Sequence, residues 1–195
     1  MDSERDRIRM DVEAQNARVA ALLGELPDDQ LQRRPDPARW SIAEHLAHVA
    51  IFTDLYVSEL RRVIARARER GPKGEGPYRR GPIGRLVVRS IAPPVRRRMS
   101  SPKKVQPPPV AGRDAASGTF HEAQDALLAT LERAGGVDLG RAIVPSPVTP
   151  LPRLRAIQAF EAVVAHTDRH LWLIDRMRAE IPTARSRNPD SNEMP

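Results

Sequence analysis

The stretch AFEAVVAHTDRHLWLIDRM, residues 159–177, indicates what kind of fold the chain adopts. Its apolar residues recur every three or four positions, which is typical of a helix with one buried face. His166 and His170 lie four positions apart within it, so both project from the same side of the helix, whereas Asp168 points almost the opposite way. Two such imidazoles can bind one divalent ion, but a third ligand must come from another helix because two hold a metal poorly.

Helical patterns of the same kind recur along the chain. We expect helices at about 4–24, 41–70, 114–134 (or from 117) and 153–180. Ser41 and Glu44 form an S-x-x-E capping box at the start of the second helix. With no convincing strand, these four helices predict an all-α four-helix bundle.

A long connection separates the second and third expected helices. Residues 71–113 are rich in proline, glycine and arginine, with a short apolar piece at 83–91 that is compatible with a turn of helix. A connection of this length can cross the bundle, so the two middle helices can run parallel. We expect one domain over residues 1–183, including this crossover, and a disordered polar tail at 184–195.

Charge is concentrated in one segment. Residues 61–104 contain 15 basic and 2 acidic residues, a net charge of +13, whereas the whole chain carries +7. Tyr78 is the only aromatic residue there, which gives little surface for stacking on bases, so a nucleic-acid partner is unlikely on this reading. The segment also lacks the amphipathic pattern of a membrane-surface helix.

Composition excludes some classes of chemistry. The chain has no cysteine, which removes disulfides, thiolate metal sites and a cysteine nucleophile. The charged N-terminus has no apolar signal region, and no window approaches 18 apolar residues. We therefore expect a cytoplasmic protein without a membrane partner, and the richness in Arg, Ala and Pro suggests a bacterial source.

The third metal ligand can be sought among the remaining histidines. His45 and His48 both face the apolar side of the second helix; periodicity mildly favours His45, whereas His48 lies deeper in the helix. His121 stands near a helix start and is expected to be solvated. Glu44 and Glu161 are candidate partners of the histidines, although both point away from the apolar stripe.

Three stretches together resemble the DinB-like (DinB/YfiT) family of four-helix-bundle metal-binding proteins. They are LPDDQLQRRPDPARWSIAEHLAHV at 26–49, VPSPVTPL at 144–151 and HTDRHLWLIDRM at 166–177. The first is similar to the family's Trp-Ser-x-x-Glu followed by a histidine eight positions after the tryptophan, and the third to its H-x-x-R-H pattern.

This resemblance implies the ligands and the topology. By position it assigns the metal ligands as His48, His166 and His170, and it favours His48 over His45. It implies an up-down-down-up bundle with the long link as the crossover, a divalent ion such as zinc or nickel, and often a homodimer. Leu173 departs from the family, which often has a polar residue such as Gln there.

The function expected from this resemblance is that of a metal-dependent enzyme acting on a small-molecule substrate. Some relatives transfer a low-molecular-weight thiol, bacillithiol or mycothiol, so we expect a thiol S-transferase or a hydrolase. Arginines of the link would then line the entrance and recognise an anionic thiol. The alternative is a non-enzymatic metal-binding bundle, or a nucleic-acid-binding one that acts through the arginine-rich link.

Overall fold

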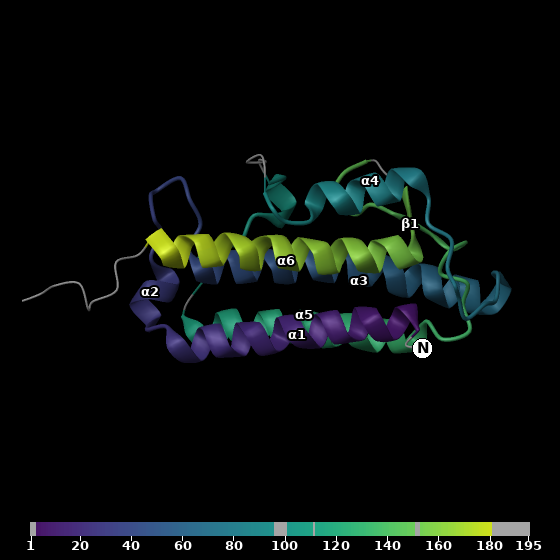
Figure 1. The fold of residues 1–195 in the computed structure, drawn as a ribbon, viewed down its shortest axis with the longest axis horizontal. Coiled ribbons are helices and arrows are strands. Elements are labelled where there is room, and N and C mark those ends of the chain that lie inside the picture. Colours follow the sequence, from purple (N-terminus) through teal and green to yellow (C-terminus); the bar gives the residue numbers. More distant parts are fainter. Residues whose placement is uncertain (1–2, 96–100, 111, 151–152, 181–195) are drawn as a thin grey trace, which may run out of the picture.

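The computed structural model describes residues 3–95, 101–110, 112–150 and 153–180. Its main elements are four long helices that lie side by side (Figure 1). They are α1 (Glu4–Glu25), α3 (Ile42–Arg70), α5 (Arg113–Arg133) and α6 (Ala156–Glu180). The predicted all-α four-helix bundle is therefore confirmed.

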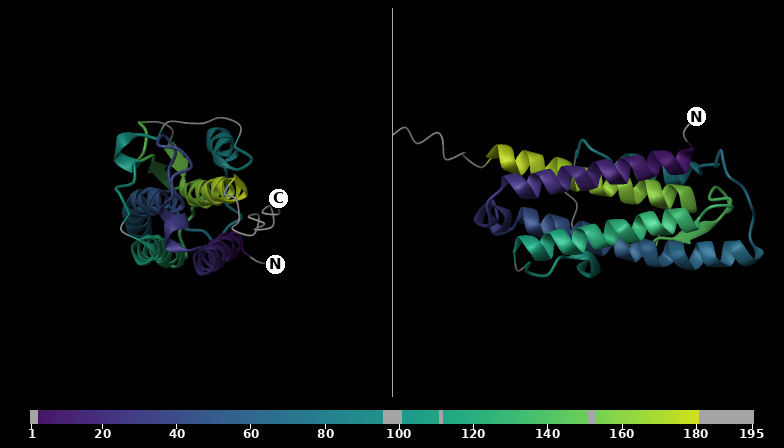
Figure 2. Two further views of the ribbon diagram at one scale, coloured as in Figure 1. Left: turned by 90° about the vertical axis from the view of Figure 1, so that its left-hand side faces the viewer. Right: turned by 90° about the horizontal axis from the view of Figure 1, so that it is seen from below.

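The four helices have an up-down-down-up arrangement. α1 and α6 run in one direction and α3 and α5 in the other, as the colours in Figures 1 and 2 show. α3 packs against both α5 and α6, and α1 packs against the same two helices. The parallel α3–α5 pair requires the chain to return along the whole bundle, and residues 71–112 make that return.

Local sequence explains where the helices begin. Ser41 and Glu44 form the predicted capping box at the start of α3, because each side chain bonds the other's backbone N–H. Ser3 and Asp6 form a second capping box, which we did not predict, at the start of α1. The helix expected at about 4–24 is α1, which ends one residue later, at Glu25.

Two apolar clusters form the core. One joins the C-terminal half of α3 to the start of α6 and to α5; its largest fully buried members include Leu60, Leu127 and Phe160. The other joins the opposite ends of the same helices around Leu46, Phe120 and Ile174. The apolar stripes read from the sequence therefore meet inside the bundle, as expected for amphipathic helices.

The connections contain more regular structure than the sequence indicated. The link contains α4 (Pro82–Ile91), which packs on α6, and the short 3-10 helix η1 (Lys103–Val105). A further short helix, α2 (Asp28–Gln32), follows α1. The expectation of no strand is wrong for one hairpin, and the rest of the bundle remains helical.

That hairpin also corrects the start of the last helix. β1 (Ile143–Pro145) pairs antiparallel with β2 (Arg153–Arg155), with Val144 opposite Leu154. Because β2 occupies residues 153–155, α6 begins at Ala156 and not at 153. Both paired side chains are buried, so the hairpin closes this end of the core.

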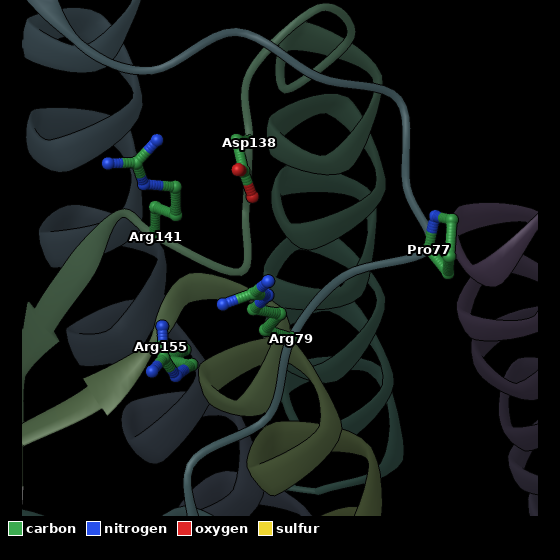
Figure 3. Close-up of a pocket in the computed structure, with 5 residues that line it drawn as sticks. All are labelled: Pro77, Arg79, Asp138, Arg141 and Arg155. Carbon is green, nitrogen blue, oxygen red and sulfur yellow. The ribbon is translucent and has the colours of Figure 1, made fainter.

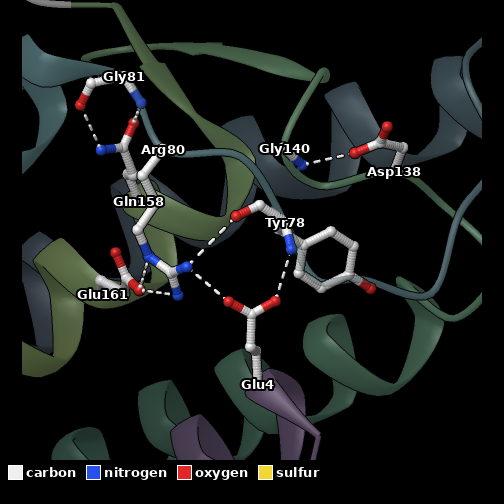
Figure 4. Close-up of polar contacts among 8 residues, drawn as sticks. All are labelled: Glu4, Tyr78, Arg80, Gly81, Asp138, Gly140, Gln158 and Glu161. Carbon is white, nitrogen blue, oxygen red and sulfur yellow. Dashed lines mark hydrogen bonds and ion pairs between the residues drawn. The ribbon is translucent and has the colours of Figure 1, made fainter.

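The first part of the link is held firmly against the end of the bundle. Lys73 forms a β-bridge with Val137, and the Asp138 N–H donates to the Pro72 carbonyl at 3.0 Å. Farther on, Arg80 forms ion pairs with both Glu4 and Glu161, which lie on α1 and α6 (Figure 4). The link is therefore an ordered layer here.

The Gln158 amide adds a second attachment next to Arg80. It accepts from the Gly81 N–H at 3.1 Å and donates to the Gly81 carbonyl at 2.9 Å, as Figure 4 shows. Gln158 is almost fully buried, so both polar ends of its amide need partners and find them on one glycine. The link is thereby fixed to α6 just before α4 begins.

Within the described ranges, no helix combines the length and apolar character needed to cross a membrane. The predicted disordered tail at 184–195 lies outside the described residues.

Gly140 allows the link to approach the loop before β1. A Cβ at this position would lie 2.4 Å from the Arg79 backbone nitrogen and 3.0 Å from its carbonyl oxygen. We predict that Gly140→Ala lowers the free energy of unfolding by about 1–3 kcal/mol, because backbone must move. Chemical denaturation monitored by circular dichroism measures the change.

Gly24→Ala is the matched control. No atom lies within 4 Å of a Cβ placed there, and the position is inside α1. The same glycine-to-alanine change should stabilise the protein by about 0.5–1 kcal/mol. Equal effects of the two substitutions would contradict the close approach at Gly140.

Candidate metal centre

Three histidines from two neighbouring helices meet inside the bundle. His48 lies in the second turn of α3, and His166 and His170 lie one turn apart in the middle of α6. One ring nitrogen from each lies within 4.8 Å of the others, and all three side chains are buried. Among the described residues, no other group of histidines and carboxylates gathers in this way.

His48 is oriented by the crossover link. The Val105 carbonyl oxygen lies 2.5 Å from its Nδ1, so this nitrogen carries the proton and donates it. Nε2 is then left with a free lone pair, and it lies 3.3 Å from Nε2 of His166. Val105 is itself buried, so the link residues that supply this carbonyl are part of the packed structure.

A fourth histidine supports the group from one side. His45 Nδ1 lies 2.8 Å from His170 Nδ1, so one ring donates a proton and the other accepts it. When His170 is the donor, its Nε2 is unprotonated. The sequence left open whether His45 or His48 completes the cluster; the structure places His48 in it and His45 directly behind His170.

Aromatic side chains pack against the histidine cluster. Phe52 stacks on His166, with ring centroids 3.7 Å apart and planes inclined by 11°. Trp40 lies 4.7 Å from the His48 ring and also faces His45 and His170. The rings thus pack against apolar surface with little freedom to rotate.

Burial keeps these histidines neutral. Desolvation, with help from neighbouring His48, lowers the pKa of His45 to about 4. Desolvation also lowers the pKa of His48, despite the opposing effect of the hydrogen bond that His48 donates to the Val105 carbonyl, and lowers the pKa values of His166 and His170 well below the usual value. Neutral imidazole is the form that ligates metals.

The donor set fits a divalent transition metal. Imidazole nitrogens suit zinc, nickel and similar ions, and three histidines leave a coordination position open. Nδ1 of His166 is buried and has no hydrogen-bond partner in the described structure, which is costly for a polar atom. The convergence of one ring nitrogen from each of the three histidines is the arrangement that a cation would stabilise.

Other candidates from the sequence lie elsewhere. Glu44 pairs with Arg34 and caps α3, and Glu161 pairs with Arg80, so neither bonds a histidine of the cluster. His121 is only partly buried and stacks edge-on against Phe120. Asp168 accepts a hydrogen bond from Gln15, in agreement with its expected outward direction.

Arg79 and Arg80, two arginines of the link, do not line the cluster. Arg80 forms ion pairs with Glu4 and Glu161, and Arg79 lies near the start of α6. His166 lies eleven residues beyond Arg155, the residue before α6, which is about 16 Å along a helix. The expected entrance lined by arginines is therefore not formed by these residues.

Comparison with known families identifies the class of this bundle. The DinB superfamily model matches residues 11–174, which include α3, most of α6 and all four buried histidines. The chain belongs to the DinB superfamily. Searches of curated proteins and of solved structures returned no significant match.

The sequence missed three neighbours of the cluster. Trp40 and Phe52 were not predicted as neighbours of the histidines, although both contact histidine rings. Val105 could not be found at all, because a backbone carbonyl has no sequence signature. For Phe52 a signal did exist, since it lies four positions after His48 on the same helix face.

The lowered pKa values predict a pH-dependent stability of the metal-free protein. Between about pH 6.5 and 4 the unfolded chain binds protons that native His45 does not, so stability is present above pH 6.5 and falls on acidification. His45 alone accounts for about 2 kcal/mol lost at pH 5 relative to pH 7.5. Denaturation in the presence of a chelator at the two pH values measures this difference.

His45→Gln should reduce that pH dependence, because it removes the buried ionisable ring. An unchanged pH dependence in His45→Gln would contradict the assignment of a buried, neutral His45.

Proposed function

We propose that His48, His166 and His170 hold a divalent metal ion and that this DinB-superfamily bundle is a metal-dependent enzyme. The observation that supports the proposal most strongly is the convergence of three buried, neutral imidazoles from α3 and α6. Burying several polar rings in a core is costly unless they have a partner. Membership of the superfamily adds independent support.

The ligand number favours a catalytic role. Structural zinc sites are usually closed by four protein ligands, whereas three protein ligands leave a position for a small molecule. Neutral ligands also leave the ion its full charge, and zinc or nickel fits the imidazole donors best. His45 and Val105 would act behind the ligands by fixing the orientation of His170 and His48.

The reaction we propose is activation of a nucleophile, either a low-molecular-weight thiol or water. A divalent ion supplies a Lewis acid that lowers the pKa of such a group. Trp40 and Phe52 provide the apolar walls that limit access of bulk water. No carboxylate joins the three histidines in the part of the chain that is described, so the proposal assigns no general base.

Metal content tests the site directly. We expect about one divalent ion per chain in the wild type after incubation with zinc or nickel and desalting. The triple variant should bind no metal, because its donors are removed; it combines His48→Ala, His166→Ala and His170→Ala. Elemental analysis gives the stoichiometry, and His121→Ala serves as the control that keeps its metal.

Circular dichroism must show that the triple variant remains helical. Absence of metal from a folded wild type, even with excess zinc or nickel, would refute the proposal. Once metal is bound, a screen of thiols with electrophilic substrates, and of hydrolysable esters and amides, distinguishes the two nucleophiles.

The His45→Ala variant tests whether His45 binds the metal itself or only orients His170. We predict one ion per chain with an affinity weaker by about 10- to 100-fold, as is typical when a partner of a ligating histidine is lost. Competition with a chromophoric chelator measures the affinity. Loss of the stoichiometric ion would make His45 a ligand, and an unchanged affinity would show that its contact with His170 contributes nothing to metal binding.

A further inference from the structure

A cavity lies at the end of the bundle where α6 begins. It has a volume of about 570 Å³ and is lined by Pro77, Arg79, Asp138, Arg141 and Arg155 (Figure 3). These residues come from the link, from the loop before β1 and from the last residue of β2. The cavity is separate from the histidine cluster, which lies farther along α6.

The cavity brings like charges together without neutralising them. Three arginines line it, and Asp138 is the only acidic residue in its lining. Within the described ranges, Arg79 and Arg141 form no side-chain hydrogen bond or ion pair. Arg155 donates to the Gly140 carbonyl, so it is held in place but is not paired with a carboxylate. The lining therefore carries a net charge of +2.

The backbone around the cavity is fixed. Gly140 packs directly against Arg79, and Asp138 accepts from the Gly140 N–H at 2.9 Å (Figure 4). The bridge between Lys73 and Val137 joins the same two segments. The arginines are therefore carried on an ordered frame and not on a free loop, and such pre-organisation lowers the entropic cost of binding.

We propose that this cavity binds a phosphate-bearing small molecule. The planar fork of arginine matches the oxygens of a phosphate, and a phosphate monoester carries a charge close to −2 at neutral pH, which matches the lining. The volume exceeds that of inorganic phosphate alone and falls in the range of small-molecule pockets. The first N–H groups of α6 do not contribute, since Ala156 and Ile157 donate to Ala142 and Leu139.

The arginines of the link do not all have the same surroundings. Arg80, the immediate neighbour of Arg79, is paired with two glutamates. Adjacent arginines thus have different environments: Arg80 stabilises the fold, whereas Arg79 lines the cavity and has no ion pair among the described residues. A link whose arginines served only solubility would not require them to converge on a cavity.

Titration with inorganic phosphate and pyrophosphate, followed by calorimetry and by ³¹P NMR, tests the proposal. We expect saturable binding of one anion per chain. Arg79→Gln and Arg141→Gln should each weaken it at least tenfold, because each removes a charged donor. Arg66→Gln removes the same charge from an exposed position of α3 and should change the affinity by less than twofold.

A substitution that is expected to tighten anion binding provides a second test. Asp138→Asn keeps an oxygen for the Gly140 N–H but removes the negative charge, so it should tighten anion binding severalfold. Thermal unfolding of each variant excludes loss of the fold. Equal weakening in Arg66→Gln, or no saturable binding, would overturn the proposal. Succinate binding as tightly as phosphate would overturn the assignment to phosphate.

Discussion

The packing of α3 against α6 is the constraint on which the site depends. It removes four histidine rings from water and places them against one another and against two aromatic rings. Desolvation disfavours the charged imidazolium, so the same contact that completes the core also supplies neutral nitrogen donors at ordinary pH. The same α3–α6 contact therefore completes the core and keeps the histidines neutral. Moving one helix away from the other would disrupt the core packing and expose the histidines to water.

The helical part of this arrangement could be predicted from the sequence. The apolar period of residues 159–177 placed His166 and His170 on one face, and the Ser41–Glu44 box fixed where α3 starts. The choice between His45 and His48 could not be made from periodicity, because both face inward and are less than one turn apart. That choice depends on how α3 is rotated and shifted against α6, which is a tertiary property.

The connections were predicted less well for a different reason. β1 and β2 have only three residues each, so no alternating pattern is long enough to detect, and the paired Val144 and Leu154 are buried by packing that the sequence does not show. Proline and glycine in the link correctly indicated irregular backbone. They gave no information on where that backbone would bond, such as the Val105 carbonyl that meets His48.

The crossover link orients His48, a role that its amino-acid composition does not indicate. A parallel α3–α5 pair obliges the chain to travel back along the bundle, and this return brings the link first past the start of α6 and then past the start of α3. At the first place Arg80 and Gly81 bind α6, and at the second Val105 fixes the tautomer of His48. Its cost in ordering backbone is offset by buried contacts at both ends, including those of Tyr78 and Val105. The topology that made the link long therefore also places it where it can orient a ligand, so the orientation of His48 follows from the connectivity of the bundle as well as from its helices.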